Sequence, residues 1–220
     1  MNLTSVLTAS ILAEEFGRGD ASFFCAPAGG FWAMRPAMFA GNTAVLDEFA
    51  PRFLGQDLYI ACFAMTESHG GCNIENMDMH GMGITTTARL DGDEGVINGS
   101  KVWPTNSGIA DLYLVVCTTD PSLGDAGIAL IYVPVPAKGF SFGRFEDKAG
   151  FRGSREGDFY FDNVRVPKAF RAAGPGRDAE LLHDNIVYAR IFSAAWAIGC
   201  AQGAFDEVLA FTKDRLAAGK

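Results

Sequence analysis

The hydrophobic pattern of this chain changes its period twice, and these changes limit the folds that the chain can adopt. From Leu3 to about Leu54, apolar residues recur at helical spacing. From Leu58 to Val166 the period is two, as in β-strands. From Asp178 the helical period returns for about forty residues. This order predicts an α+β protein with a helical N-terminal zone, an antiparallel β-barrel-like middle domain and a long C-terminal helix.

Glycines and a proline divide the N-terminal zone. Gly17, Gly19 and the pair Gly29-Gly30 mark breaks, so we expect about three helices before residue 54. Asn42-Thr43 offers a cap for the last of them, and Pro51 is expected to end or kink it.

Short β-branched and aromatic runs in the middle zone predict several strands, among them 112–116, 128–133 and 158–161. The dipeptides Asp91-Gly92 and Asn98-Gly99 are typical of turns between such strands. We therefore expect an antiparallel sheet whose strands are joined by short connections.

The C-terminal helix is too long for an ordinary globular helix. About forty residues would extend roughly 60 Å at 1.5 Å per residue. Such a helix would leave a wide apolar stripe in water unless other helices cover it. We expect another chain, or a further part of the same chain, to supply these helices.

Charge and cysteine content argue against several classes of function. The net charge of −8, from 26 acidic and 18 basic residues, is unsuited to a nucleic-acid surface. Five cysteines without a CxxC pair indicate neither a disulfide framework nor a zinc knuckle and favour a reducing compartment. No run approaches the ~20 apolar residues of a membrane span, and the N-terminus lacks the basic segment of a signal peptide. We interpret the protein as cytoplasmic.

No metal site is predicted. His69, His80 and His183 lack the i, i+4 pairing or the Cys/His spacing of metal ligands. The acidic run that begins at Asp91 lacks the ligand alternation of a calcium loop and is interpreted as a solvated hairpin turn.

Two segments of the middle zone have the chemistry of a flavin pocket. Residues 61–73 close a strand-like run with Thr66-Glu67 and two glycines, and residues 101–106 place Trp103 beside Thr105. A flat flavin ring requires a hydroxyl, exposed backbone N–H groups and an aromatic face from its host. Alone, Trp103 is more often a core residue, and Thr66-Glu67 an ordinary strand end. Together the segments favour half of a flavin pocket.

These segments resemble the acyl-CoA dehydrogenase superfamily in order and spacing, over essentially the whole chain. The most specific are Thr66-Glu67, the Asn98-Gly99 turn that leads to Lys101 and Trp103, and the run FDNVRVP at 161–167. The resemblance implies a helical N-domain, a β-barrel-like middle domain and a C-terminal four-helix bundle, with FAD between them. In these terms the chain comprises a partial N-domain, the flavin and substrate domain, and the start of an incomplete bundle, at residues 1–57, 58–167 and 168–220.

The resemblance also implies roles for individual residues. The strand that contains Phe63 and the turn after it would follow the flavin edge, with the Thr66 hydroxyl at the pyrimidine ring. Trp103 would cover a ring face and Thr105 would reach toward N5, where hydrogen-bond donors stabilise the reduced flavin. Arg215 would contact the FAD pyrophosphate across a dimer interface, or alternatively belong to an exposed charged turn. The cofactor-binding residues are then Phe63, Met65, Thr66, Gly71, Cys72, Trp103, Pro104, Thr105 and Arg215.

Substrate contacts are assigned to Cys72 and Arg190. Cys72 stands where the family usually has a serine, and Arg190 matches an arginine that orients residues around the acyl-CoA. An ion pair with Asp184 is the alternative for Arg190. The family abstracts an α-proton with a carboxylate and transfers the β-hydrogen as hydride to flavin N5. In some members that carboxylate immediately precedes the arginine, but Ala189 stands there, so no catalytic residue is predicted.

The leading interpretation is a subunit or segment of an FAD-dependent acyl-CoA dehydrogenase that passes electrons to an electron-transfer flavoprotein. The base would come from outside this chain, which resembles the central two-thirds of such an enzyme. Residues 85–89 and 102–108 are also similar to nitroalkane oxidase, a flavin oxidase. A third interpretation is a non-catalytic partner that completes another dehydrogenase through Arg215. In each case we expect a homo- or hetero-oligomer in which another chain supplies the remaining helices.

Overall fold

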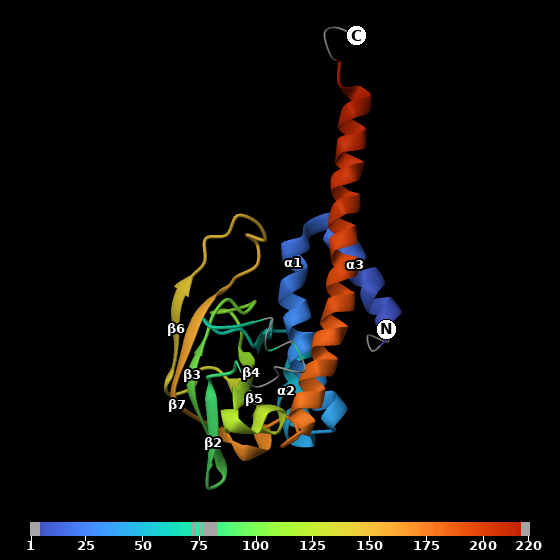
Figure 1. Ribbon diagram of the computed structural model, residues 1–220. Helices are drawn as coiled ribbons and strands as arrows, with labels where there is room; N and C mark the ends of the chain where they lie inside the picture. Colours follow the sequence, from blue (N-terminus) through green and yellow to red (C-terminus); the bar gives the residue numbers. More distant parts are fainter. Residues whose placement is uncertain (1–4, 72–73, 75, 77–82, 217–220) are drawn as a thin grey trace. The chain divides into compact units, whose positions relative to one another are not determined.

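The computed structural model describes residues 5–71, 74, 76 and 83–216. They divide into two compact units, a larger one of residues 25–186 and a smaller one formed by the residues up to Phe24 and from Val187 onward. Figure 1 shows the elements in chain order. They are α1 (Val6–Ala40), α2 (Thr43–Phe53), β1 (Ala61–Ala64), β2 (Thr87–Asp91), β3 (Glu94–Lys101), β4 (Leu112–Thr118), η2 (Pro121–Gly127), β5 (Ile128–Pro134), β6 (Phe140–Phe145), β7 (Gly157–Pro167), η3 (Lys168–Phe170) and α3 (Arg177–Asp214). The α+β fold class is confirmed.

One sheet holds the strands of the described residues. Its order is β1-β4-β2-β3-β7-β6, and β5 pairs with β4. The pairs β2 with β3, β3 with β7, β6 with β7 and β4 with β5 are antiparallel, as expected. In contrast, β1 runs parallel to β4, from Ala61 opposite Leu112 to Ala64 opposite Val115. The long connection through β2 and β3 permits this direction, because parallel neighbours need a crossover.

The two turn dipeptides of the middle zone differ in structure. Asp91-Gly92 lies at the β2–β3 hairpin turn, with Gly92 at φ +64°. Asn98-Gly99 is not a turn, so that prediction was wrong. It lies inside β3, where the pairing with β7 shifts register between Ile97 and Gly99. Gly99 has φ +139°, and a Cβ there would lie 2.7 Å from the Cα of Thr86, so the bulge requires glycine.

Strands β4 and β5 are buried on both faces. Leu112 and Leu114 belong to a core that the sheet forms with helices of the larger unit. The alternating residues Tyr113 and Val115 belong to a second core, which includes Phe159 and other residues of β3 and β7. The curled sheet therefore encloses one core and packs its other face against helical segments of the larger unit.

Helix α1 is continuous across the glycine pair at which a break was expected. The structure has α1 and α2 in this zone, and α1 consists of two helical segments joined at a kink, so three helical segments are present as expected. Gly29-Gly30 lies inside the second segment of α1. The irregular residue of α1 is instead Asp20, with φ −151° and ψ 108°. Its carboxylate accepts hydrogen bonds from the backbone N–H groups of Ser22 and Phe23, at 2.8 and 3.3 Å, so it caps the helical segment that follows.

Helix α2 begins at the predicted cap. The Asn42 side chain accepts a hydrogen bond from the Val45 backbone N–H at 3.1 Å. Its amide group also donates to the backbone carbonyls of Ala169, Arg171 and Ala172, at 3.1, 2.8 and 3.2 Å. Asn42 thus caps α2 and ties the start of that helix to the segment after β7.

Two buried side chains compensate for Pro36 inside α1. Proline has no N–H group, which leaves the carbonyl of Trp32 without its helical donor. The Asn185 amide donates to that carbonyl at 3.2 Å. The Tyr132 hydroxyl accepts from the Ala37 N–H at 3.1 Å and donates to the Ala33 carbonyl at 2.7 Å, so it enters the helical ladder.

Glycines allow close contact between α1 and α3 in the smaller unit. A Cβ on Gly17 would lie 2.4 Å from the Trp196 carbonyl oxygen, and one on Gly199 would lie 2.0 Å from the Glu14 carbonyl oxygen. Near this crossing Arg18 pairs with Asp206 at 2.5 Å. The long C-terminal helix is confirmed, since α3 contains 38 residues. No helix in the described ranges is both long and apolar enough to cross a membrane.

Candidate flavin site

The turn after β1 contains the first predicted flavin residues. Phe63 is partly buried in β1, Met65 is 9% exposed, and Thr66 is half-buried. No hydrogen-bond partner of the Thr66 hydroxyl is present among the described residues. Not all N–H groups of the turn are available: Glu67 and Gly70 donate to each other's carbonyls at 2.9 and 3.1 Å.

The Glu67 carboxylate is buried and saturated with donors. One oxygen accepts from Lys101 Nζ at 2.7 Å and from the Thr86 N–H at 2.9 Å. The other accepts from the backbone N–H and the hydroxyl of Thr85, at 2.7 and 2.5 Å. Burial alone would raise the pKa of this carboxyl, but the Lys101 charge and these hydrogen bonds lower the pKa to about 2. Glu67 is therefore a carboxylate at neutral pH.

Lys101 lies at the end of β3 and is fully buried. Its ammonium group donates to the Met65 carbonyl at 3.0 Å as well as to Glu67. Burial lowers the pKa of Lys101, while the charge of Glu67 opposes that shift. The next residue, Val102, donates its backbone N–H to the Thr66 carbonyl at 3.0 Å. The end of β3 is thus bonded directly to the turn after β1.

Trp103 is exposed, which contradicts the alternative of a core residue. Its side chain is 57% exposed and its backbone has φ +65°. The backbone N–H of Trp103 donates to the Gly157 carbonyl at 3.1 Å, and the indole N–H donates to Glu146 at 3.3 Å. A left-handed backbone costs roughly 1–2 kcal/mol in a residue with a side chain. The indole is therefore fixed in place with much of its surface open to a ligand.

The residues after Trp103 are held by two further segments. Pro104 is buried, and the half-buried Thr105 pairs with Glu156 in an isolated β-bridge. Asn106 follows at φ +71°, a conformation that asparagine tolerates. Its amide donates to the carbonyls of Ala26 and Ala61, at 3.2 and 2.9 Å. The loop after β3 is therefore attached both to α1 and to the start of β1.

The structure brings most of the predicted cofactor residues into adjacent segments, but not all of them. Gly71 is half-buried, and a Cβ there would lie 3.4 Å from Thr66 Cγ2. Cys72 lies outside the described residues. Arg190, exposed on α3, and Arg215, whose guanidinium lies 5.6 Å from the Phe211 ring centroid, belong to the smaller unit.

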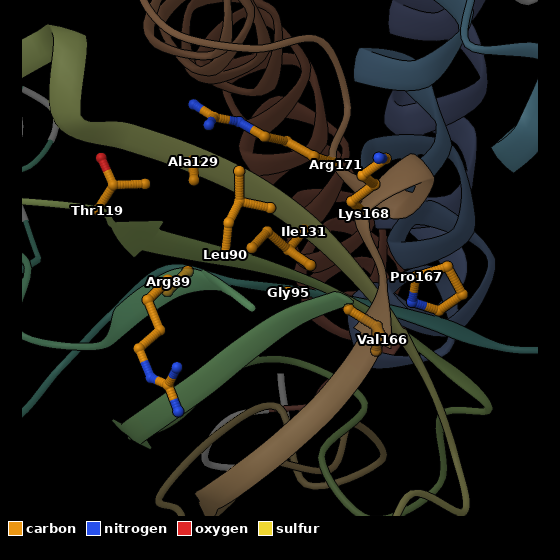
Figure 2. Close-up of a pocket in the computed structure, with 11 residues that line it drawn as sticks. Arg89, Leu90, Gly95, Thr119, Ala129, Ile131, Val166, Pro167, Lys168 and Arg171 are labelled. Carbon is orange, nitrogen blue, oxygen red and sulfur yellow. The ribbon is translucent and has the colours of Figure 1, made fainter. Parts of the chain in front are cut away.

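A small crevice beside β2, β5 and β7 is unsuited to a flavin (Figure 2). Its volume is about 30 Å³, whereas small-molecule sites enclose about 300–1,000 Å³. Three of its lining residues are basic, but Arg89, Lys168 and Arg171 all have carboxylate partners. The described ranges contain no group of three or more His, Cys, Asp or Glu side chains that could hold a metal.

The local motifs predict the candidate ligand contacts but not the residues that support them. They indicate Thr66 and Trp103, but not the ion pair of Glu67 with Lys101 or the two donor bonds of Asn106. A signal for the ion pair exists, since Lys101 occupies an inward position in the alternating burial of β3. A buried lysine requires a partner, but only the folded chain shows that the partner is Glu67.

Comparisons with known proteins identify the family to which these segments are similar. Residues 62–164 match the family model of the acyl-CoA dehydrogenase middle domain. Cyclohex-1-ene-1-carbonyl-CoA dehydrogenase of Geobacter metallireducens is 33% identical, over 98% of this chain and 55% of that protein. Butyryl-CoA dehydrogenase of Megasphaera elsdenii has a TM-score of 0.87 at 29% identity, over 98% of this chain and 55% of that one. Nitroalkane oxidase of Podospora anserina has a TM-score of 0.86 at 26% identity, over 98% and 54%.

The helical zone, the curled sheet and the long helix are thus the architecture of an acyl-CoA dehydrogenase-like flavoprotein. The chain belongs to the acyl-CoA dehydrogenase superfamily, as its motifs predicted. It spans about half the length of the curated relatives that it matches, less than the two-thirds expected from the sequence.

Proposed function

We propose that this chain is the flavin-binding part of an FAD-dependent acyl-CoA dehydrogenase. The observation that carries the proposal is the bond between the two predicted flavin segments, from the Val102 N–H to the Thr66 carbonyl at 3.0 Å. Next to this bond lie a hydroxyl without a partner among the described residues and an indole that is 57% exposed. These are the groups that a flat heteroaromatic ring requires.

The described residues fit a flavin in distinct roles. Thr66 would bind the polar edge of the ring through its hydroxyl, and Trp103 would cover one face and exclude water from it. Thr105 would approach N5, and Phe63, Met65, Pro104 and Gly71 would complete the wall together with Cys72. The flavin would accept the β-hydrogen of a CoA thioester as hydride. The α-proton would be taken by a carboxylate from a part of the enzyme outside this chain.

The remaining partners follow from the same assignment. Arg190 would orient groups around the acyl-CoA, and Arg215 would contact the FAD pyrophosphate in an oligomer. An electron-transfer flavoprotein would accept the electrons, and further helices would pack on α3. The free cysteines of the described residues, Cys25, Cys62, Cys117 and Cys200, are consistent with a reducing cytoplasm.

Flavin binding tests the proposal. The purified chain is titrated with FAD, and binding is followed by the visible spectrum and by flavin fluorescence. We expect binding by the wild type, and a dissociation constant at least about tenfold higher for Trp103→Ala, because a stacking face is lost. Leu54→Ala, at a side chain that is 87% exposed, is the matched control and should bind as the wild type does. A wild-type chain that never binds FAD, with or without other parts of the enzyme, would contradict the proposal.

The nitroalkane oxidase relationship supports a second candidate function. The TM-score of 0.86 to that oxidase is close to the value for butyryl-CoA dehydrogenase. In the assembled flavoprotein, anaerobic bleaching by acyl-CoA with slow reoxidation by dioxygen would identify the dehydrogenase. Bleaching by a nitroalkane with rapid release of peroxide would identify the oxidase. Failure of both substrates in an assembled, FAD-loaded complex would favour a non-catalytic partner subunit.

A further inference from the structure

Glu67 and Lys101 form an ion pair that is closed to solvent. Their side chains are 1% and 0% exposed, and the Nζ to Oε1 distance is 2.7 Å. Taking both charges out of water costs free energy that their attraction does not always recover. Such a pair is therefore weak evidence for stability, and its position in the fold is the more informative property.

The pair lies between the two proposed flavin segments. Lys101 Nζ donates to the Met65 carbonyl and to the Glu67 carboxylate, and the Val102 N–H donates to the carbonyl of Thr66 between them. Three consecutive residues of the turn after β1 are thus bonded to two consecutive residues at the end of β3. Trp103 is the next residue in the chain, so its distance from Thr66 depends on these bonds.

A third segment fixes the other side of the carboxylate. Thr85 and Thr86 donate their backbone N–H groups to Glu67, and Thr85 adds its hydroxyl. Thr86 in turn donates its hydroxyl to the Ser100 carbonyl at 3.1 Å and packs against the bulge at Gly99. The carboxylate is held on both sides, so it cannot shift without moving β3 as well.

We propose that Glu67 and Lys101 are positioning residues of the flavin pocket, which set the spacing between the Thr66 hydroxyl and the Trp103 indole. This inference rests on the proposed function. A hydroxyl and an indole bind a cofactor well only when they stand at the correct spacing. In enzyme sites, a misplacement of about 1 Å can lower the reaction rate about 10²-fold.

The first test compares Lys101→Met with a matched control. Asp178→Asn likewise removes one charge of an ion pair, because buried Asp178 pairs with Arg171 at 2.6 Å and accepts from the Ala173 N–H at 2.9 Å. None of these residues is a proposed flavin contact. Each full chain is titrated with FAD at a temperature at which circular dichroism shows it folded. We expect the FAD dissociation constant to rise at least about tenfold for Lys101→Met and to stay within about twofold for Asp178→Asn.

The double variant Glu67→Gln/Lys101→Met keeps the inference testable where the single variant does not fold. It removes both charges, so no unpaired ion is buried and the fold should recover. We expect FAD affinity to remain weak in the folded double variant and the visible flavin spectrum to differ from that of the wild type. Wild-type affinity in either folded variant, or equal losses in Lys101→Met and Asp178→Asn, would overturn this inference alone. A wild-type chain unable to bind FAD would instead overturn the proposed function beneath it.

Discussion

At the scale of single residues, Glu67 is the clearest case of an ionisable group whose state is set by its surroundings. Lys101, Thr85 and Thr86 supply its donors, and together they outweigh the effect of burial, so the pKa falls from its ordinary value of 4.5 to about 2. The free energy of unfolding must therefore depend on the protonation of this group.

We expect the chain to lose stability in acid because of Glu67. Its folded pKa lies below its unfolded pKa, so the contribution is fully present above pH 4.5 and is lost as the pH falls toward 2. The loss attributable to this carboxyl is about 3 kcal/mol at 1.36 kcal/mol per pKa unit. Urea denaturation between pH 6 and pH 2 measures most of this loss, with Glu67→Gln as the comparison. An unchanged pH dependence in that variant would show that Glu67 does not carry the effect.

The proposed site could be predicted from sequence only where ligand-facing residues lie in a local motif. Thr66 and Trp103 stand in such motifs. Asn106, in contrast, donates to Ala26 and Ala61, which lie 80 and 45 residues away. Contacts across such separations depend on the packing of the whole sheet, and no local pattern determines them.

At the scale of elements, α1 depends on groups from other elements to remain helical at Pro36. The Tyr132 hydroxyl from β5 bonds both Ala33 and Ala37. We expect Tyr132→Phe to lower the free energy of unfolding by about 1–3 kcal/mol, because two buried backbone groups lose their partner. Tyr160→Phe, at a side chain that is 46% exposed, should change it by less than about 0.5 kcal/mol. Chemical denaturation of both variants measures the difference, and equal effects would refute this role of Tyr132.

The glycines of α1 and α3 make a second prediction at this scale. Gly199→Ala would place a Cβ 2.0 Å from a backbone oxygen of Glu14, so the helices must separate. We expect a loss of at least about 2 kcal/mol, in the range of overpacked cores. Gly19→Ala meets nothing within 4 Å and should be neutral or stabilising by up to about 1 kcal/mol, because alanine favours the helix. Thermal unfolding compares the two, and a stable Gly199→Ala chain would contradict the close contact.

Close backbone packing also explains why the break expected at Gly29-Gly30 is absent. Gly17 lies three residues before the kink at Asp20, whereas Gly29 lies inside a helical segment where a neighbouring backbone approaches it. A Cβ on Gly29 would lie 2.5 Å from the Ala61 carbonyl oxygen. Glycine occurs both where a helix ends and where another backbone packs closely against a helix, and the local sequence does not distinguish these two cases. The hydrophobic periods, which report burial directly, did predict the strands β4, β5 and β7 and the long helix.

At the scale of the molecule, the second half of α3 carries large apolar side chains that are well exposed in its unit. Phe205, Val208 and Phe211 are 59–60% exposed. We expect the isolated chain to self-associate as its concentration rises, because patches of this kind are covered in stable proteins. The double substitution Phe205→Glu/Val208→Glu should shift sedimentation toward the monomer, whereas Leu54→Glu should leave it unchanged. A wild-type chain that stays monomeric at high concentration would refute the prediction.

The burial of β4 and β5 on both faces has a consequence for how the larger unit opens. Their side chains are covered by one core on each face, which limits the access of water to their backbone N–H groups. Exchange of these amide hydrogens with solvent requires the helices and the curled sheet to come apart together. Amide exchange in β4 and β5 therefore reports the global unfolding of this unit, and a partner that binds the folded unit would slow that exchange.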